Sequence, residues 1–249
     1  MPFLGHIAEL RRRLIVIAAV VLVGSSVLYF FAPTMYDFVM KPIIELPQLA
    51  GKPMNILGPF GTFGLRFTVA LYGALVLGSP IILWQVLAFF LPALKAKERK
   101  YVVPTFAALV VFFATGVIFC YQVILHTAFG WMISQAWGTV QVLPDARLYF
   151  SGATLLMLGF GISFELPVVL FYLLIFNIVP YKKLRQNWRI VYVVLMVIAS
   201  VATPDWSPVT MGALFGALVV LWEGSMAFSR VVLRRRIAQQ KALYGELAD

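Results

Sequence analysis

The stretch FGISFELPVV, residues 160–169, places one carboxylate, Glu165, inside a long apolar run. No charged residue occurs from Leu148 to Phe164, and none occurs from Leu166 to Tyr181. If this run crosses a bilayer, Glu165 lies near its middle, where an ionisable group costs at least ~2.5 kcal/mol. The stretch therefore predicts a membrane span with one polar residue that needs a structural or functional reason.

The composition extends this prediction to the whole chain. Of the 249 residues, 62% are hydrophobic and only 12% are charged, and the mean hydropathy is +0.93. Soluble domains have about 25% charged residues, so a polytopic membrane protein is predicted. The single Cys120 excludes an internal disulfide and a cysteine metal cluster. The charged, amphipathic N-terminus predicts no removable signal peptide.

Charges and turn residues divide the chain into six apolar segments, so we expect one integral membrane domain, residues 1–249, with an all-α fold of six transmembrane helices. An amphipathic helix at 2–13 precedes the first span, and the outer loops 33–66 and 126–147 are expected to be structured. The spans are expected at about 14–32, 67–94, 101–125, 148–179, 188–202 and 209–228.

The fifth and sixth spans look short. Residues 188–202 give ~22 Å of helix, and 209–222, the apolar part before Glu223, gives ~21 Å, against ~30 Å of hydrocarbon. We therefore expect a concave, glove-like molecule with a lipid-facing groove and Glu165 in the wall of that groove.

Basic residues gather on one side of this topology. Of the 20 Lys and Arg residues, only Lys41, Lys52, Arg66 and Arg147 lie on the other side. By the positive-inside rule the crowded side is cytoplasmic, which puts both termini in the cytoplasm. The net charge of +10 is therefore interpreted as topology and not as nucleic-acid binding. The 16 residues of the crowded side are Arg11, Arg12, Arg13, Lys95, Lys97, Arg99, Lys100, Lys182, Lys183, Arg185, Arg189, Arg230, Arg234, Arg235, Arg236 and Lys241.

Motifs for catalysis are missing from the sequence. It has no HExxH, no GxSxG and no Walker lysine loop. His6 and His126 fall on opposite predicted sides, so neither a metal site nor a cofactor is expected. Gly159 and Gly161 predict close helix packing within the membrane. The chain is predicted not to be an enzyme.

Three carboxylates remain as candidates. Glu165 is either a protonated or hydrogen-bonded group that holds helices together, or a polar spot that contacts a polypeptide. Pro167 leaves the carbonyl of Ser163 without an intrahelical partner, which adds polarity there. Glu9, in HIAELRRRL at 6–14, can pair with an arginine three or four residues later on the same helix. Glu98, in KAKERK, looks by itself like an ordinary loop charge.

Three stretches together resemble the signature segments of the TatC family, the multispanning receptors of the twin-arginine protein translocase. They are HIAELRRRL at 6–14, SPIILWQVLAFFLPALKAKER at 79–99 and FGISFELPVVL at 160–170. Shorter matches are KPI at 41–43, ATPD at 202–205 and FSR at 228–230. Their order and spacing agree with the six-span topology and cover nearly the whole chain.

The resemblance implies a function and partners. A TatC-like chain would bind twin-arginine signal peptides of folded cargo at its cytoplasmic face, in a prokaryotic inner membrane. It would form a hetero-oligomer with single-span TatA-type and TatB-type proteins, and export would use the proton motive force.

The family motifs also imply roles for single residues. The signal-peptide site would consist of Glu9, Glu98, Arg11 and Phe89, Glu165 would be an intramembrane polar site, and Pro42, Tyr121 and Asp205 would matter on the outer side. Val209 replaces a glutamine that is common in the family, which puts a partner contact there in doubt.

A function of another class competes with this interpretation. A proton-coupled secondary transporter could use Glu165, although transporters usually carry several intramembrane polar groups and paired broken helices. An intramembrane hydrolase would need a nucleophile and base that the sequence does not suggest.

Overall fold

The computed structural model describes residues 3–49, 51–56, 58–90, 102–137, 142–175, 179–203 and 207–232. Regular structure in these ranges is helical, apart from one isolated bridge between Asn55 and Asp145. The elements are α1 (Phe3–Leu28), η1 (Tyr29–Phe31), α2 (Ala32–Ile44), α3 (Pro59–Leu77), α4 (Ser79–Phe90), α5 (Val102–Phe119), the π-helical turn η4 (Cys120–Ile124), α6 (Leu125–Ser134), α7 (Ala146–Ser163), α8 (Leu166–Ile175), α9 (Tyr181–Gln186), α10 (Trp188–Ala202) and α11 (Pro208–Val232).

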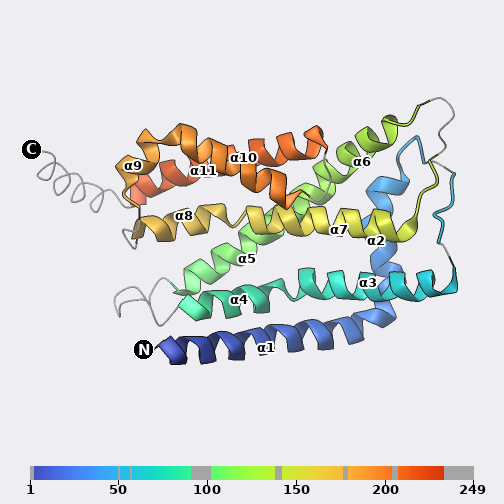
Figure 1. Ribbon diagram of the computed structural model, residues 1–249, viewed down its shortest axis with the longest axis horizontal. Helices are drawn as coiled ribbons and strands as arrows, with labels where there is room; N and C mark the ends of the chain where they lie inside the picture. Colours follow the sequence, from blue (N-terminus) through green and yellow to red (C-terminus); the bar gives the residue numbers. More distant parts are fainter. Residues whose placement is uncertain are drawn as a thin grey trace, which may run out of the picture.

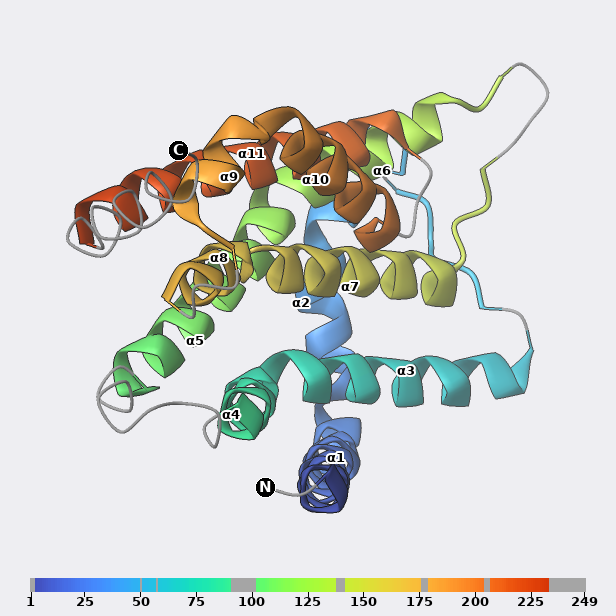
Figure 2. The same cartoon turned by 60° about the vertical axis from the view of Figure 1, so that its left-hand side comes forward.

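The helices confirm an all-α membrane fold with six spans. Five stretches are long and apolar enough to cross a bilayer, and two shorter apolar helices, α4 and α10, accompany them. α4 follows α3 in the second span but is turned relative to it, and α10 forms the fifth span (Figures 1 and 2). The long stretches are Ile7–Ile44, Phe60–Leu77, Val102–Ser134, Ala146–Leu174 and Pro208–Val231.

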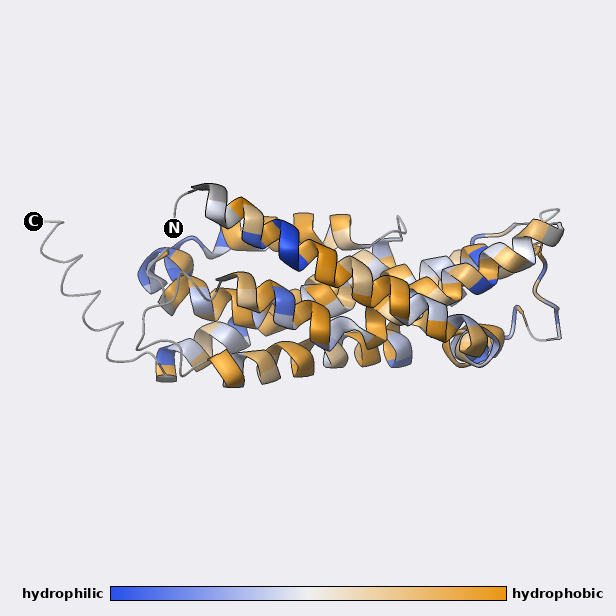
Figure 3. Cartoon of the chain, turned by 90° about the horizontal axis from the view of Figure 1, so that it is seen from below, coloured by the Kyte–Doolittle hydropathy of each residue, from blue (hydrophilic) through white to orange (hydrophobic). Residues whose placement is uncertain are grey.

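The helices run mostly along the long axis of the molecule (Figure 1). The start of α1, the end of α4, the start of α5 and the end of α11 meet at one end, and α2 packs across α3, α6 and α7 near the other (Figures 1 and 2). Hydrophobic residues dominate the lengths of the helices, while hydrophilic stretches lie toward the two ends (Figure 3). This distribution is the one that a bilayer imposes on its spans.

Glycines allow α5 and α7 to cross closely. A Cβ atom added to Gly116 would lie 2.7 Å from the carbonyl oxygen of Phe160 and 2.9 Å from the Cβ of Phe164. On the facing helix α7, a Cβ on Gly161 would lie 2.8 Å from the ring of Phe113 on α5. A Cβ on Gly159 would meet the carbonyl oxygen of Ala202 at the end of α10, so α7 also packs closely against that helix. The close packing predicted for Gly159 and Gly161 is therefore confirmed.

The last span is longer than predicted. α10 has 15 residues and is short, as expected, but α11 has 25 residues, or ~37 Å, and exceeds the ~30 Å hydrocarbon thickness. The sixth span was expected at about 209–228, already past Glu223, but its helix extends to Val232, so the expectation that this span is short was wrong. The Glu223 carboxylate within it pairs with Arg185. At the other end of the chain, α1 runs without a break from Phe3 into the first span.

The crossing of α5 and α7 can be tested by adding a methyl group. Gly116→Ala should destabilise the protein by about 1–3 kcal/mol, because the new Cβ meets a backbone oxygen that cannot move aside cheaply. The matched control is Gly212→Ala in α11, where nothing lies within 4 Å of the added atom. That change should leave stability unaltered or raise it by up to about 1 kcal/mol. Thermal unfolding of the purified protein in detergent measures both, and equal midpoints would contradict the close crossing.

Candidate functional site

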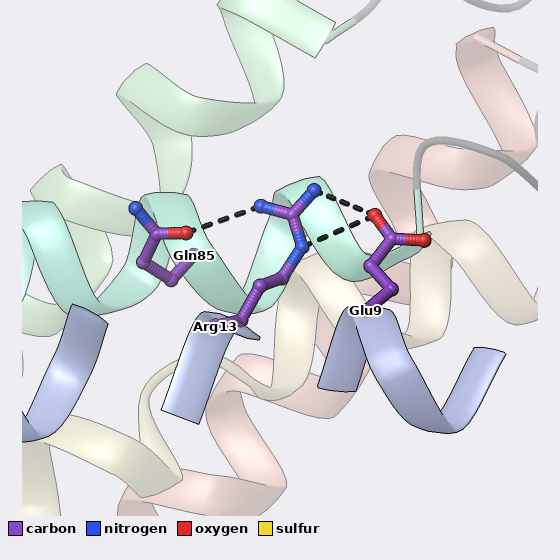
Figure 4. A network of polar contacts seen from close by, with 3 residues as sticks. All are labelled: Glu9, Arg13 and Gln85. Carbon is purple, nitrogen blue, oxygen red and sulfur yellow. Dashed lines mark hydrogen bonds and ion pairs between the residues drawn. The ribbon is translucent and has the colours of Figure 1, made fainter. Parts of the chain in front are cut away.

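A polar network joins the beginning of α1 to α4 (Figure 4). Arg13 donates from Nη2 and Nε to the same oxygen of Glu9, Oε1, at 2.7 and 3.3 Å. Its third nitrogen, Nη1, donates to Oε1 of Gln85 on α4 at 3.1 Å. The side chains of Glu9 and Arg13 are only 20% and 23% exposed. Of the two partners that the sequence allowed for Glu9, the structure selects Arg13, four residues later.

The orientation of α1 explains this burial. Its apolar residues Ile7, Leu10 and Leu14 are 43–55% exposed, so the apolar stripe faces outward, where a bilayer or its interface would cover it. The polar pair lies on the inward side, against α4, and is shielded by helix packing. A partly shielded ion pair interacts more strongly than a solvated one.

The other predicted members of this site are only partly placed. Glu98 lies in 91–101, outside the described residues. Phe89 is half-buried and one helical turn beyond Gln85 on α4, while Arg11 is exposed on α1. The structure thus brings Glu9 against α4, the helix that precedes the segment containing Glu98 in the sequence.

Glu165 lies at a break between two helices. α7 ends at Ser163 and α8 begins at Leu166, with Glu165 donating its backbone N–H to Ile162 in a tight turn. Pro167 causes the break, because it has no N–H to continue the helix. Both carboxyl oxygens of Glu165 are buried, and no donor among the described residues reaches them. Such an atom is costly to bury, so this position needs an explanation beyond packing.

Two of the predicted outer-side residues, Tyr121 and Pro42, lie where α2 packs against η4 and α6. Tyr121 donates its hydroxyl to the carbonyl oxygen of Phe38 at 2.9 Å, and the two rings stack with centroids 5.0 Å apart. Pro42 lies one turn further along α2, and its carbonyl oxygen is 3.2 Å from Nδ1 of His126. These contacts join α2 to η4 and α6. Asp205, the third predicted residue, lies outside the described residues.

A second ion pair was not predicted from the sequence. Arg185 on α9 donates from Nη1 to Oε2 of Glu223 at 2.7 Å, and Tyr192 on α10 donates its hydroxyl to Oε1 at 3.1 Å. The guanidinium also lies 5.9 Å from the ring of the buried Trp222. The hydrogen bond to Glu223, with its negative charge, raises the pKa of Arg185. We call these residues the α9–α11 clamp; the only sequence signal for it is an acid within the last apolar segment.

The described residues contain an apolar cavity away from the candidate carboxylates, and they contain no cluster of side chains that could bind a metal ion. An apolar cavity of about 310 Å³ lies between α6 and the start of α7 and is lined by residues that include Phe129, Met132 and Tyr149. Neither Glu9 nor Glu165 lines it. No group of three His, Cys, Asp or Glu side chains in the described ranges could hold a metal ion.

Comparison with known proteins identifies the family. The family model for the Sec-independent protein translocase protein (TatC) matches residues 5–216. The chain belongs to the TatC family. It is 32% identical to TatC of Deinococcus radiodurans over 92% of this chain and 86% of that protein. It is 36% identical to TatC of Escherichia coli K12 over 82% of this chain and 78% of that one.

Solved structures agree with the sequence match. A crystal structure of the twin-arginine translocase receptor TatC superposes with a TM-score of 0.75 at 25% identity, covering 91% of this chain and 98% of that one. The same receptor crystallised in DDM gives a TM-score of 0.74 at 26% identity and covers 90% and 98%. The chain is therefore a multi-pass membrane protein of a protein-translocase family, whose named members are components of Sec-independent protein transport.

The α9–α11 clamp predicts a coupled response to charge changes. Arg185→Gln and Glu223→Gln should each lower the thermal unfolding midpoint by no more than about 2 °C, because the two side chains are 54% and 42% exposed and a solvated ion pair contributes little. Exchanging the charges, Arg185→Glu with Glu223→Arg, should recover at least half of that loss. Lys182→Gln, an exposed change of the same charge on α9, serves as the control. A charge exchange that is no better than the single variants would contradict the clamp.

Proposed function

We propose that this TatC-family chain is the core receptor of a twin-arginine translocase and binds twin-arginine signal peptides at its cytoplasmic face. The observation that carries the proposal is the Glu9 carboxylate. It is held by Arg13 through one oxygen, and the other oxygen, Oε2, accepts no hydrogen bond from the described residues. The description of the similar crystal structures as twin-arginine translocase receptors supports the same function.

The chemistry of arginine recognition fits this carboxylate. A guanidinium is planar, always charged and carries donors in a fork that matches a carboxylate. A fixed acid with an available oxygen can receive one arginine, and Glu98 on the segment after α4 would receive the second. Arg11 and Phe89 would flank the bound peptide. Shielding of Glu9 by α4 would strengthen the interaction relative to a freely hydrated acid.

The proposed orientation follows from the charges. The start of α1 and the end of α11 lie at one end of the molecule (Figure 1), together with the basic α9, so this end would face the cytoplasm of a prokaryotic cell. Pro42, Tyr121 and Asp205 would then support the opposite, outer side. We further propose that the chain works with TatA-type and TatB-type single-span proteins and that the proton motive force drives export.

Glu165 supports a second candidate function. A buried carboxyl group with no donor among the described residues could carry protons, as in a proton-coupled transporter. The receptor interpretation gives Glu165 another role, as a polar contact for the membrane-inserted part of a signal peptide or for a partner helix. The two functions differ in whether ionisation of this group is needed.

The arginine site is tested by removing both acids. Glu9→Ala combined with Glu98→Ala should abolish binding of a twin-arginine peptide, because no carboxylate is left to receive either guanidinium. The variant should still insert and purify as the wild type does. Binding of a labelled peptide to the purified protein provides the measurement, and undiminished binding by the double variant would rule out these two residues as the site.

The role of Glu165 is tested by two substitutions. Glu165→Gln keeps a hydrogen-bonding side chain and should retain most cargo export. Glu165→Ala removes all polarity and should impair a step after peptide binding, with binding at Glu9 and Glu98 preserved. Export and peptide binding are measured for both variants. If the Gln variant is as inactive as the Ala variant, ionisation is required and the proton-coupled function is favoured; if Ala exports normally, Glu165 has no role in export.

A further inference from the structure

An apolar cavity of about 310 Å³ lies between the last turns of α6 and the first turns of α7. Its lining includes Phe129 and Met132 from α6, and Tyr149, Gly152 and Leu156 from α7. Both helices belong to stretches that are long and apolar enough to cross a bilayer, and the end of α6 and the start of α7 lie far from the N-terminus (Figure 1). The cavity therefore lies within the hydrocarbon layer, close to one of its two faces.

The lipid-facing surface of α7 continues into this cavity. Leu148, Leu155 and Ile162 are 72%, 40% and 65% exposed and follow each other at intervals of seven residues, so they form one apolar stripe that a bilayer covers. Leu148 also lines the cavity. Trp137, which is 76% exposed just beyond the end of α6, is suited to the membrane interface nearby. A lipid beside the stripe can therefore extend a chain between the two helices.

The lining disfavours water and favours hydrocarbon. The side chains that line the cavity carry one hydroxyl group, that of Tyr149, whereas an ordered water needs about two to four polar partners. An apolar cavity about half this size can bind a benzene molecule. The volume between α6 and α7 therefore accepts a segment of acyl chain. It is too small for a partner helix, which is ~10 Å wide with its side chains.

We propose that the cavity between α6 and α7 binds one acyl chain of a membrane phospholipid, which enters from the lipid-facing side at Leu148. The bound chain fills a packing gap between the third and fourth spans, next to the place where α2 packs against α6 and α7. Such a lipid site is independent of peptide recognition at Glu9.

Gly152 allows the cavity to be filled by mutation. A Cβ added to it would lie 3.4 Å from Cζ of Phe129, which is an ordinary contact, so a larger side chain at this position occupies the space between the helices. Gly216 on α11 is the matched control position, because nothing lies within 4 Å of its added Cβ. Met132→Ala has the opposite effect and enlarges the cavity.

The test uses a phospholipid that carries a photoreactive diazirine at the end of one acyl chain. The full-length protein is placed in nanodiscs that contain this lipid, and crosslinked residues are mapped by mass spectrometry. Wild-type crosslinks are expected on the cavity-lining turns of α6 and α7. Gly152→Leu should lower their yield by at least about fourfold, the effect on affinity of excluding a single methylene group. Gly216→Leu should leave the yield unchanged, and Met132→Ala should keep or raise it. Crosslinks at the exposed Leu22 on α1 should be equal in all of these proteins and serve as the internal reference.

Equal cavity crosslinking in Gly152→Leu and the wild type would overturn the proposal, and so would an equal decrease in Gly216→Leu. If Gly152→Leu does not fold, Gly152→Ala takes its place and should give a smaller decrease. An unchanged yield in Gly152→Ala together with a lower yield in Met132→Ala would contradict the site. The labelling is repeated in membrane vesicles of producing cells supplied with the same lipid. Cavity crosslinks that form in nanodiscs but not in these vesicles would assign the cavity to a side chain of a partner protein and overturn the proposal.

Discussion

A bilayer offers no hydrogen bonds to a polar group, and this constraint governs each part of the structure. Backbone groups must be satisfied within the chain, so the described spans are helices. Carboxylates in or near these spans need partners, and Glu9 and Glu223 each have an arginine. Glu165 differs from them, because neither of its oxygens has a partner among the described residues. Glu165 lies at the break between α7 and α8, so the one described carboxylate whose two buried oxygens lack a partner is found where the helix is interrupted.

Features encoded locally could be predicted from the sequence. The hydropathy pattern predicts the helical membrane fold, and Pro167 predicts a missing helical hydrogen bond at Ser163. The break between α7 and α8 beside Glu165 was not predicted, because the span 148–179 was expected to be one helix. The helical repeat limited the partners of Glu9 to two arginines, but the choice of Arg13 depends on Gln85, which lies on another helix. Features that depend on distant residues were not predictable in this way.

The sixth span illustrates that limit. Its sequence is interrupted by Glu223, which by itself indicates the end of an apolar segment. In the folded chain Arg185, 38 residues earlier, neutralises this acid, and Tyr192 donates to it as well. The helix continues past this acid to Val232. The contact of Tyr121 with Phe38 is a similar case, since it joins residues 83 positions apart.

The two ion pairs suggest different uses of the same chemistry. In the α9–α11 clamp, each carboxylate oxygen of Glu223 accepts one hydrogen bond, from Arg185 and from Tyr192, and the acid thereby joins α9, α10 and α11. In Glu9 both bonds from Arg13 fall on one oxygen, which leaves capacity for a further donor. This difference is the physical basis for placing arginine recognition at Glu9, beside α4, and not at Glu223.

The central claim is that an arginine pair binds beside α1 and the end of α4. The most direct measurement is photocrosslinking from a peptide that carries a reactive residue next to its arginine pair, followed by mass spectrometric mapping on the purified protein. Crosslinks are expected at residues near Glu9 and in the segment after α4, and they should be lost when the arginine pair is replaced by lysines. Crosslinks that are independent of the arginines, or that map to α10, α11 or the outer loops, would contradict it.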